Sequence, residues 1–189
     1  MTMVSLCALV LSGPGGAEPT AYASATSCAA ALGPTLQTGS LLFSTGDCLA
    51  VRVFTQSAYT HVAIAVVTDA GPFIYESTNP AGVRKLPLEE FLACHATAPV
   101  HPLHPCRPLS ADRCQQLTDY LESQLGRPYS VQHHLTGQRC AGLHCAEYCP
   151  DALCAVDLIR AERPPRVSPA SLRTGVTQHL LYVPGITIQ

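Results

Sequence analysis

The segment that most constrains the fold is residues 61–67, with the sequence HVAIAVV. Every residue after His61 is apolar and most are β-branched, which is typical of a strand buried on both faces. A turn is predicted over 69–72 and a second strand over 73–76, so the two strands should form a hairpin. The chain must therefore build a sheet and cover both of its faces with other elements.

The rest of the sequence predicts more strands, then helices, then a final strand. The prolines in 98–109 indicate that any strand there is short or lies at a sheet edge. The other predicted elements are strands over 41–43, 82–85 and 179–183, short helices over 47–57 and 87–94, a helix capped by Ser110 that runs to Leu125, a helix over 145–159 and a helical turn after Ser168. This order predicts an α+β fold, with a mostly antiparallel sheet packed against helices.

The N-terminal 38 residues differ from the rest in composition. Residues 1–23 have an apolar run and an Ala21-Tyr22-Ala23 cleavage-like site, as in an export signal, although no Lys or Arg precedes the run. A disordered N-terminus is the alternative, and the protein would then be cytoplasmic. Residues 24–38 are rich in small residues and proline and are predicted to be a linker. We expect one folded domain over 39–189.

The charge pattern excludes some classes of partner. Charged residues make up 13% of the chain and the net charge is -2, and no basic stripe of the kind that binds nucleic acid is present. No segment has the length of a transmembrane helix, so no integral membrane segment is expected. The expected partner is a small-molecule or peptide substrate, and the sequence carries no signal of oligomeric state.

Ten cysteines are many for 189 residues. In an exported protein some would pair, whereas in the cytosol they would remain thiols or bind metal. One window combines several ligands that zinc accepts, namely Cys94, His95, His101, His104 and Cys106. Prolines interrupt this window, and no second donor pair at a familiar spacing completes it. We therefore predict no metal and no cofactor.

One cysteine is placed for nucleophilic chemistry. Cys145 begins a predicted helix, and a helix N-terminus can lower a thiol pKa from about 8.5 to between roughly 3.5 and 7.5. His61 opens the buried strand, and Glu76 lies on its hairpin partner where the two side chains can face one side. A thiol needs an imidazole base, and the imidazole needs a polar partner. The hypothesis is a catalytic set of Cys145, His61 and Glu76; the alternative from the residues alone is a buried core thiol, a structural histidine and a hairpin-edge carboxylate.

Six short motifs follow one another from residue 39 to about residue 155. In chain order they are Gly39-Ser40-Leu41-Leu42-Phe43, Ser57-Ala58-Tyr59-Thr60-His61-Val62-Ala63-Ile64, Ile74-Tyr75-Glu76-Ser77, Gly82-Val83-Arg84 with Pro87-Leu88, Gly126-Arg127-Pro128-Tyr129-Ser130, and His144-Cys145-Ala146-Glu147-Tyr148-Cys149. With these motifs the chain resembles the circularly permuted papain-like amidases, the YiiX-like branch of the NlpC-type peptidase superfamily. In that family the histidine strand precedes the cysteine helix, as it does here.

The resemblance implies roles for individual residues. Cys145 would be the nucleophile, His61 the base and Glu76 its orienting partner. Tyr129 would line the substrate pocket, and Tyr59 and His144 are further candidates for substrate binding. His144 is also a second candidate for the base, ranked lower because neighbours on a helix do not face each other. Pro150 falls inside the predicted nucleophile helix and should kink or shorten it.

The implied activity is a cysteine-dependent hydrolase with a permuted papain-like fold. It would cleave amide or peptide-like bonds through an acyl-thioester, with cell-wall peptides or acylated amino compounds as candidate substrates. Two alternatives stay open. One is an acyltransferase or thioesterase for lipid-like substrates, which an apolar cleft beside Cys145 would favour. The other is a degenerate binding domain without catalysis, which a blocked thiol or a distant His61 would favour.

Overall fold

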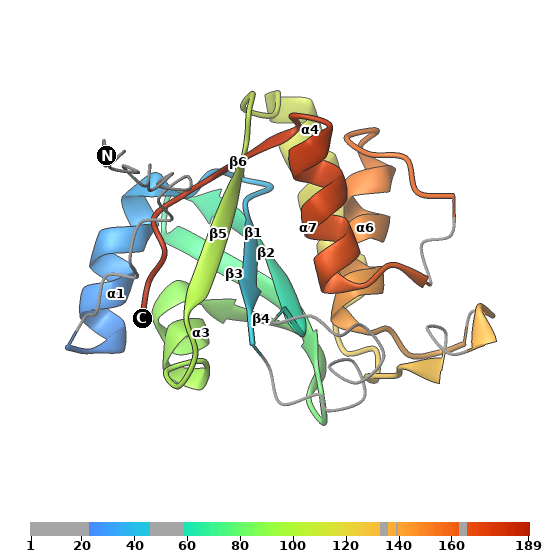
Figure 1. Cartoon of the computed structure of the whole chain (residues 1–189), viewed down its shortest axis with the longest axis horizontal. Coiled ribbons are helices and arrows are strands. Elements are labelled where there is room, and N and C mark those ends of the chain that lie inside the picture. The colour runs from blue at the N-terminus through green and yellow to red at the C-terminus, as the bar shows by residue number, and fades with distance from the viewer. Residues whose placement is uncertain (1–22, 46–58, 133–135, 139, 163–165) are drawn as a thin grey trace, which may run out of the picture.

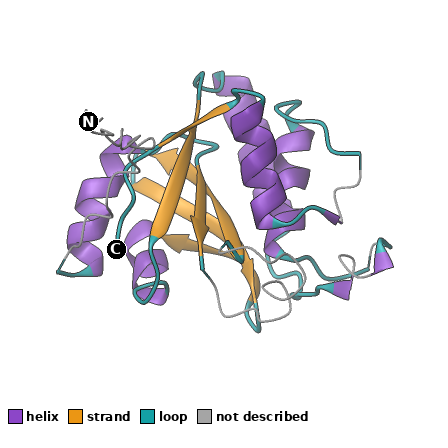
Figure 2. Cartoon of the chain, in the orientation of Figure 1, coloured by secondary structure: helices purple, strands orange, loops and turns teal. Residues whose placement is uncertain are grey.

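The protein is built around one antiparallel sheet with the strand order β4-β3-β2-β1-β5-β6 (Figures 1 and 2). The computed structural model describes residues 23–45, 59–132, 136–138, 140–162 and 166–189. The strands are β1 (Leu41–Ser44), β2 (His61–Thr68), β3 (Gly71–Thr78), β4 (Gly82–Pro87), β5 (Val100–Pro105) and β6 (Tyr182–Pro184). The helices are α1 (Ala25–Leu32), α3 (Leu88–Cys94), α4 (Ala111–Ser123), α6 (Cys145–Ala155) and α7 (Pro169–Gln178), with a 3-10 turn at Gly33–Thr35. The predicted α+β class is confirmed.

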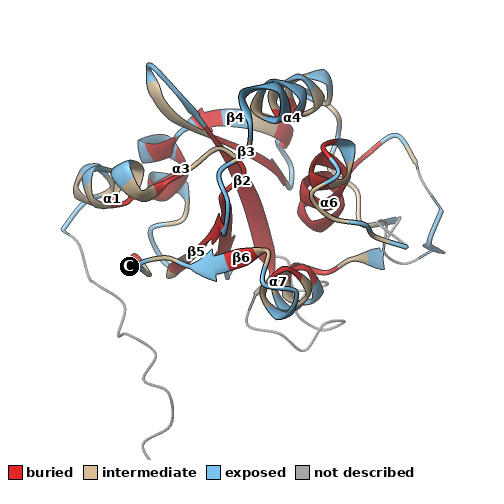
Figure 3. Cartoon of the chain, turned by 90° about the horizontal axis from the view of Figure 1, so that it is seen from above, coloured by how far each residue is buried: buried red, intermediate tan, exposed pale blue. Residues whose placement is uncertain are grey.

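Helices cover both faces of the sheet. Helices α1 and α3 lie on one face, and α4, α6 and α7 lie on the other (Figure 1). Each face of the sheet has its own hydrophobic core, and alternate residues of β2 point into one or the other. Val62 and Ile64 pack with α4 and α6, whereas Ala63 and Ala65 pack with α1 and α3. The central strands are buried, and so is α6 from Cys145 to Leu153 on all its sides (Figure 3). The prediction that residues 61–67 form a strand buried on both faces holds as far as Val66, because Val67 is 40% exposed.

Helix α1 lies in the segment 24–38, which the sequence analysis interpreted as a linker. Ser24 caps it through a reciprocal capping box with Ser27, an arrangement that satisfies two backbone donors at a helix start. Cys28 and Leu32 of this helix are buried in the core between the helices α1 and α3 and the sheet. The small residues that suggested a linker thus form a short packed helix, and the folded region extends towards the N-terminus. The predicted helix over 47–57 lies outside the described residues.

The proline-dense region, where the sequence predicted a strand that is short or at a sheet edge, forms the six-residue strand β5. It pairs with β1 on one side and with β6 on the other, so it is second from the edge. A proline lacks an N–H donor but keeps its carbonyl acceptor. The Pro102 carbonyl accepts a hydrogen bond from Gly185 N–H at 2.9 Å. Strand β6 is short and pairs only with Leu103–Pro105. The prolines of β5 therefore do not confine this strand to the sheet edge.

Helix α6 begins at Cys145 and continues through Pro150. It ends at Ala155, four residues before the predicted end at Ile159, so it is shorter than an uninterrupted pattern would suggest. Two side chains fasten it: Cys149 Sγ lies 3.7 Å from Val62 O, and Tyr148 Oη donates to Leu121 O at 2.9 Å. The helix is thereby held against β2 and α4, with its first turn at one end of the sheet. None of the described helices has both the length and the hydropathy that crossing a bilayer requires.

Two motifs that are far apart in the sequence meet beside this helix. Val83 N–H donates to Arg127 O at 2.8 Å, and Gly126 N–H donates to Val83 O at 2.9 Å. The same loop continues to Leu143, whose N–H donates to Pro128 O at 2.9 Å. Backbone hydrogen bonds therefore connect strand β4, the loop after α4 and Leu143, which precedes Cys145 by two residues.

The contact at Gly82 predicts a large loss of stability on substitution. Gly82 has φ +74°, and a Cβ atom there would lie 2.2 Å from Arg127 O. Gly82→Ala should lower the free energy of unfolding by about 3 to 5 kcal/mol, because a positive φ and a backbone clash both oppose the side chain. Gly71→Ala is the matched control, since Gly71 has φ +108° with nothing within 4 Å, and should cost about 1 to 2 kcal/mol. Denaturant unfolding of both variants tests this, and equal losses would contradict it.

Candidate active site

The fold brings the three candidate catalytic residues to one end of the sheet. His61 is the first residue of β2, Glu76 lies in β3, and Cys145 is the first residue of α6. The β2–β3 register pairs Ile64 with Tyr75, so Glu76 follows directly after the last pair at the end of β2 where His61 lies. His61 Nε2 and Glu76 Oε2 are 2.7 Å apart, and the His61 ring is also hydrogen-bonded to the thiol of Cys145. An imidazole has two nitrogens, so Nδ1 is the one left for Cys145.

Glu76 is held as a buried carboxylate. Its Oε1 accepts hydrogen bonds from Arg84 Nε at 2.8 Å and Arg84 Nη2 at 2.6 Å, while Oε2 faces His61. Burial would raise the pKa of Glu76, but the hydrogen bond and charge of His61, with those of Arg84, hold that pKa at about 2. The Arg84 side chain is 30% exposed and that of Glu76 is completely buried. The pair fixes the carboxylate so that one oxygen points at the imidazole.

The same neighbours make Cys145 acidic and His61 basic. Burial opposes ionisation of Cys145, but hydrogen bonds and charges from His144 and His61 lower its pKa to about 6. Burial also lowers the pKa of His61, yet hydrogen bonds with Cys145 and Glu76 outweigh it and raise that pKa to about 10. Cys149, one turn further along the helix, has a pKa raised well above its usual value by burial and by the charge of Cys145. Both shifts favour the ion pair, a Cys145 thiolate beside a His61 imidazolium.

His144 makes a contact that the sequence analysis did not expect. It is the N-cap of α6, with an extended backbone at φ -98° and ψ 164°, and its side chain is hydrogen-bonded to Cys145. The rule that helix neighbours face apart applies inside a helix, and His144 precedes the first helical residue. Two imidazoles from different elements, His61 and His144, thus approach one sulfur.

A cavity of about 220 Å³ opens beside the thiol. Its lining is mostly polar and includes Cys145 and His61, with Arg84 and His95 among the charged or titratable groups. The described residues that line it are Thr45, Thr60, His61, Ser77, Thr78, Asn79, Arg84, Cys94, His95, Thr97, Ala98, Tyr129 and Cys145. Tyr129, predicted to line the pocket, is one of them. The hydroxyl, amide and guanidinium groups suit a small polar substrate.

Tyr59 lies outside this cavity as the described residues define it. Its ring packs edge-on against Phe43 and His101, with centroid distances of 5.9 and 5.3 Å. The guanidinium of Arg173 lies 4.8 Å from the Tyr59 ring centre. The role of Tyr59 in substrate binding stays a prediction, and its ring contacts Phe43, His101 and Arg173.

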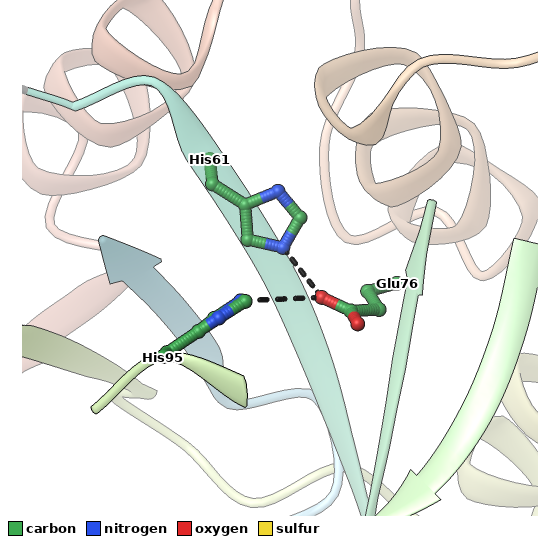
Figure 4. A group of neighbouring side chains, drawn as sticks. All are labelled: His61, Glu76 and His95. Atoms are coloured by element: carbon green, nitrogen blue, oxygen red, sulfur yellow. Dashed lines mark hydrogen bonds and ion pairs between the residues drawn. The ribbon is translucent and has the colours of Figure 1, made fainter. Parts of the chain in front are cut away.

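His95 is a residue of the site that sequence reasoning missed. It caps the C-terminus of α3, and its Nε2 lies 3.5 Å from Glu76 Oε2 (Figure 4). Its ring meets the His61 ring edge-on at a centroid distance of 5.0 Å. The sequence placed His95 in a zinc-like window, but two other members of that window lie elsewhere: His101 contacts Thr187 and His104 contacts Ser40.

The atoms around Glu76 form a donor set that suits a metal ion. His61, Glu76 and His95 each contribute one ligand atom, and these atoms lie within 4.8 Å of one another. Two imidazole nitrogens and a carboxylate oxygen are a set that zinc accepts with a fourth position left open. The residues present therefore fit a divalent transition metal, whereas the sequence analysis weighed a different donor window, residues 94–106, and predicted no metal.

Comparison with known proteins agrees with this geometry. The sequence profile described as permuted papain-like amidase enzyme, YaeF/YiiX, C92 family, matches residues 35–152. The chain belongs to this family. The permuted papain-like amidases are cysteine enzymes that act on amide bonds, so the match identifies this protein as an enzyme of that type. It also spans β1 to α6 and therefore includes all three candidate catalytic residues.

A solved structure supports the fold of this amidase independently. It is described as the crystal structure of metalloprotein yiiX from Escherichia coli O157:H7, and it superposes with a TM-score of 0.63 at 18% sequence identity. The alignment covers 79% of this chain and 96% of that one. No curated protein matches the chain by sequence. The permuted papain-like architecture predicted from the ordered motifs is thereby confirmed.

Proposed function

We propose that this amidase hydrolyses small polar amide or peptide-like substrates, with Cys145 as nucleophile, His61 as general acid and base, and Glu76 as the residue that orients His61. The observation that carries the proposal is the continuous chain from thiol to imidazole to carboxylate, in which Glu76 and His61 are 2.7 Å apart and Cys145 is hydrogen-bonded to His61. A nucleophile, its base and the group orienting that base are the parts that acyl transfer requires.

The reaction would proceed in two steps. The Cys145 thiolate attacks the acyl carbon, and the oxygen that becomes negative is stabilised by the first N–H groups of α6, which have no acceptor within a helix. His61 then donates its Nδ1 proton to the leaving nitrogen, the carbon–nitrogen bond breaks and an acyl-thioester remains. In the second step His61 takes a proton from water, the hydroxide attacks the thioester, and the acid leaves as the thiolate is restored.

The cavity lining supports a polar substrate rather than a lipid chain. An acyltransferase or thioesterase for lipids would need an apolar cleft beside Cys145, and the described lining is mainly threonine, serine, asparagine, histidine and arginine. The proposal of a binding domain without catalysis also has less support, because Cys145 is a free thiol in hydrogen-bond contact with His61. Short peptides and acylated amino compounds remain the candidate substrates.

A substrate survey with mass spectrometry tests the proposal. The wild-type protein is mixed with short peptides, N-acyl amino compounds and long-chain acyl esters, and each sample is quenched and digested. We expect an acyl group on the Cys145 peptide with the polar amides, and no amine release by Cys145→Ala. An adduct formed only from long-chain esters would support the lipid alternative, and no adduct from any of them would support the non-catalytic one.

The pH dependence of the reaction should be bell-shaped. Activity needs an ionised Cys145, whose pKa is lowered to about 6, and a protonated His61, whose pKa is raised to about 10. The rate should therefore rise as pH increases through the lower value and fall as pH increases through the upper one. A pH profile of kcat/KM with a stable amide substrate measures both limits. A rate that begins to rise only above pH 8, where an ordinary thiol ionises, would contradict the assignment.

The structural relative yiiX is described as a metalloprotein, and this chain has residues that would hold an ion. They are His61, Glu76 and His95, whose ligand atoms lie within 4.8 Å of one another. An ion of the zinc class supplies Lewis-acid polarisation when bound. The hydrolytic proposal above uses only side chains and backbone groups, and it assigns His61 and Glu76 to the thiol.

A further inference from the structure

We propose that His61, Glu76 and His95 form a reversible binding site for a divalent transition metal, and that a bound ion switches off the thiol by occupying His61. The three residues come from β2, β3 and the end of α3. In Figure 4 both rings point to one oxygen of the Glu76 carboxylate, which dashed lines join to each of them. The inhibitory half of this inference rests on the proposed function, whereas the binding half does not.

The distances are close to those of a zinc site. With metal–ligand bonds of about 2.0 to 2.2 Å, ligand atoms in a tetrahedral site are about 3.3 Å apart. His95 Nε2 and Glu76 Oε2 are already 3.5 Å apart, whereas His61 Nε2 and Glu76 Oε2 are at hydrogen-bond distance, 2.7 Å. A small opening of the His61–Glu76 contact therefore admits the ion, which takes the place of the proton shared by these two atoms.

The surroundings orient the ligands before any ion arrives. Arg84 binds Glu76 Oε1 through two nitrogens, so Oε2 is left facing the two histidines. The His95 ring is fixed by Phe91 at a centroid distance of 4.4 Å and by His61 at 5.0 Å. Partners of this kind normally align metal ligands. The positive charge of Arg84 opposes a cation, so we expect reversible binding rather than a permanent structural ion.

The ion can reach the site through the substrate cavity. His61, His95 and Arg84 all line that cavity, and the His95 and His61 side chains are 14% and 8% exposed. Three protein ligands leave the fourth position of a tetrahedral ion for solvent. The site is therefore accessible in the folded protein, and binding does not require the domain to open.

Binding would remove His61 from catalysis for a chemical reason. A neutral imidazole binds a metal through one nitrogen and keeps its proton on the other. With Nε2 on the ion, Nδ1 carries the proton and faces Cys145, so the ring has no lone pair with which to accept another. His61 can then no longer act as the base for water, and Glu76 no longer orients it. Zinc and substrate turnover thus exclude each other.

Zinc titration of matched variants tests the site. The full chain, reduced with a phosphine, is titrated with Zn²⁺ by calorimetry as wild type, Cys145→Ala, His95→Ala, His95→Gln and His179→Ala, and bound zinc is measured after gel filtration. His179 is an exposed histidine at the end of α7 and serves as the control. The other cysteines are the same in all these proteins, so zinc that they bind cancels in the comparison.

We expect Cys145→Ala and His179→Ala to bind Zn²⁺ as the wild type does. Both His95 variants should bind it at least about tenfold more weakly, with unchanged circular dichroism. Zn²⁺ should also stop amide turnover by the wild type, because His61 can no longer accept a proton from water, and should not affect the residual turnover of the His95 variants; turnover unaffected by bound zinc would overturn the inhibitory half.

Two results separate this inference from the proposed function. If Zn²⁺ binding is lost in Cys145→Ala and kept in the His95 variants, the ion binds at the thiol–imidazole pair, and the metal site is overturned while the hydrolase proposal survives. If binding depends on His95 but Cys145 proves unreactive without zinc, the metal site stands and the proposed function fails.

Discussion

Cys145→Ala should reduce kcat for amide hydrolysis on the order of 10⁵-fold, because loss of the nucleophile removes the acyl-thioester route and leaves only binding and oxyanion stabilisation. The thiol is small and its removal leaves the packing of α6 almost unchanged, so the folded structure should persist. Steady-state kinetics with an amide substrate and thermal unfolding measure the two effects separately. A variant that folds normally and keeps most of its activity would contradict the role of Cys145.

The matched control for this variant is Cys149→Ala. Cys149 is one turn further along the same helix, equally buried, and its thiol approaches Val62 O at 3.7 Å. Its pKa is raised rather than lowered, so it is not a competing nucleophile. We expect Cys149→Ala to lose stability by about 1 kcal/mol from the small cavity and to retain turnover. If both variants lose activity, the loss results from a disturbed α6 helix and not from removal of the Cys145 thiol.

His61→Ala should lower kcat by about 10²- to 10⁴-fold, the contribution typical of a positioned general acid and base. It should also raise the pKa of the Cys145 thiol, since the hydrogen bond and charge of His61 help to hold that pKa at about 6. Because Glu76 keeps its two contacts with Arg84, the buried carboxylate retains a partner and the protein should still fold. Kinetics across pH, with circular dichroism as a folding check, measure both consequences.

His144→Ala provides the comparison for His61. His144 also contacts the sulfur, from the N-cap of α6, whereas His61 is the imidazole that lies 2.7 Å from the Glu76 carboxylate. We expect His144→Ala to shift the acid limb of the pH profile upward and to lower kcat by about tenfold or less, well below the 10²-fold floor for a general base. If His144→Ala lowers kcat more than His61→Ala does, then His144 is the general base and His61 is the secondary contact.

The sheet and its main helices could be predicted because their signals are local. The apolar run after His61 allows almost nothing but a buried strand, and the Ser110 cap marks the start of α4 as observed. Helix α1 was not predicted, because its alanines and serines resemble the composition of a linker. Its stability comes from the tertiary packing of Cys28 and Leu32, for which the sequence has no local signal. The exact path of the proline-dense strand also depends on its partners, β1 and β6.

The candidate site was predictable where residues belong to ordered motifs. Cys145, His61 and Glu76 each occupy a motif position, so the sequence could select one thiol from ten. His95 has no such signal, because its place beside Glu76 arises from the packing of α3 across β3 and β4. His144 was ranked low because a rule for helix interiors was applied to a residue at an N-cap. Contacts that depend on tertiary packing or on the geometry of a helix cap thus cannot be predicted from sequence patterns.

The most direct test of the central claim is the pH dependence of Cys145 alkylation. Iodoacetamide labelling followed by peptide mapping gives the rate of each cysteine from about pH 5 to about pH 9. Cys145 should label first near neutral pH, faster than the exposed Cys106, with a midpoint near the lowered pKa of about 6, and His61→Ala should move that midpoint upward. If Cys145 labels no faster than Cys114 or Cys154, or if His61→Ala leaves its midpoint unchanged, the thiolate–imidazolium pair is contradicted.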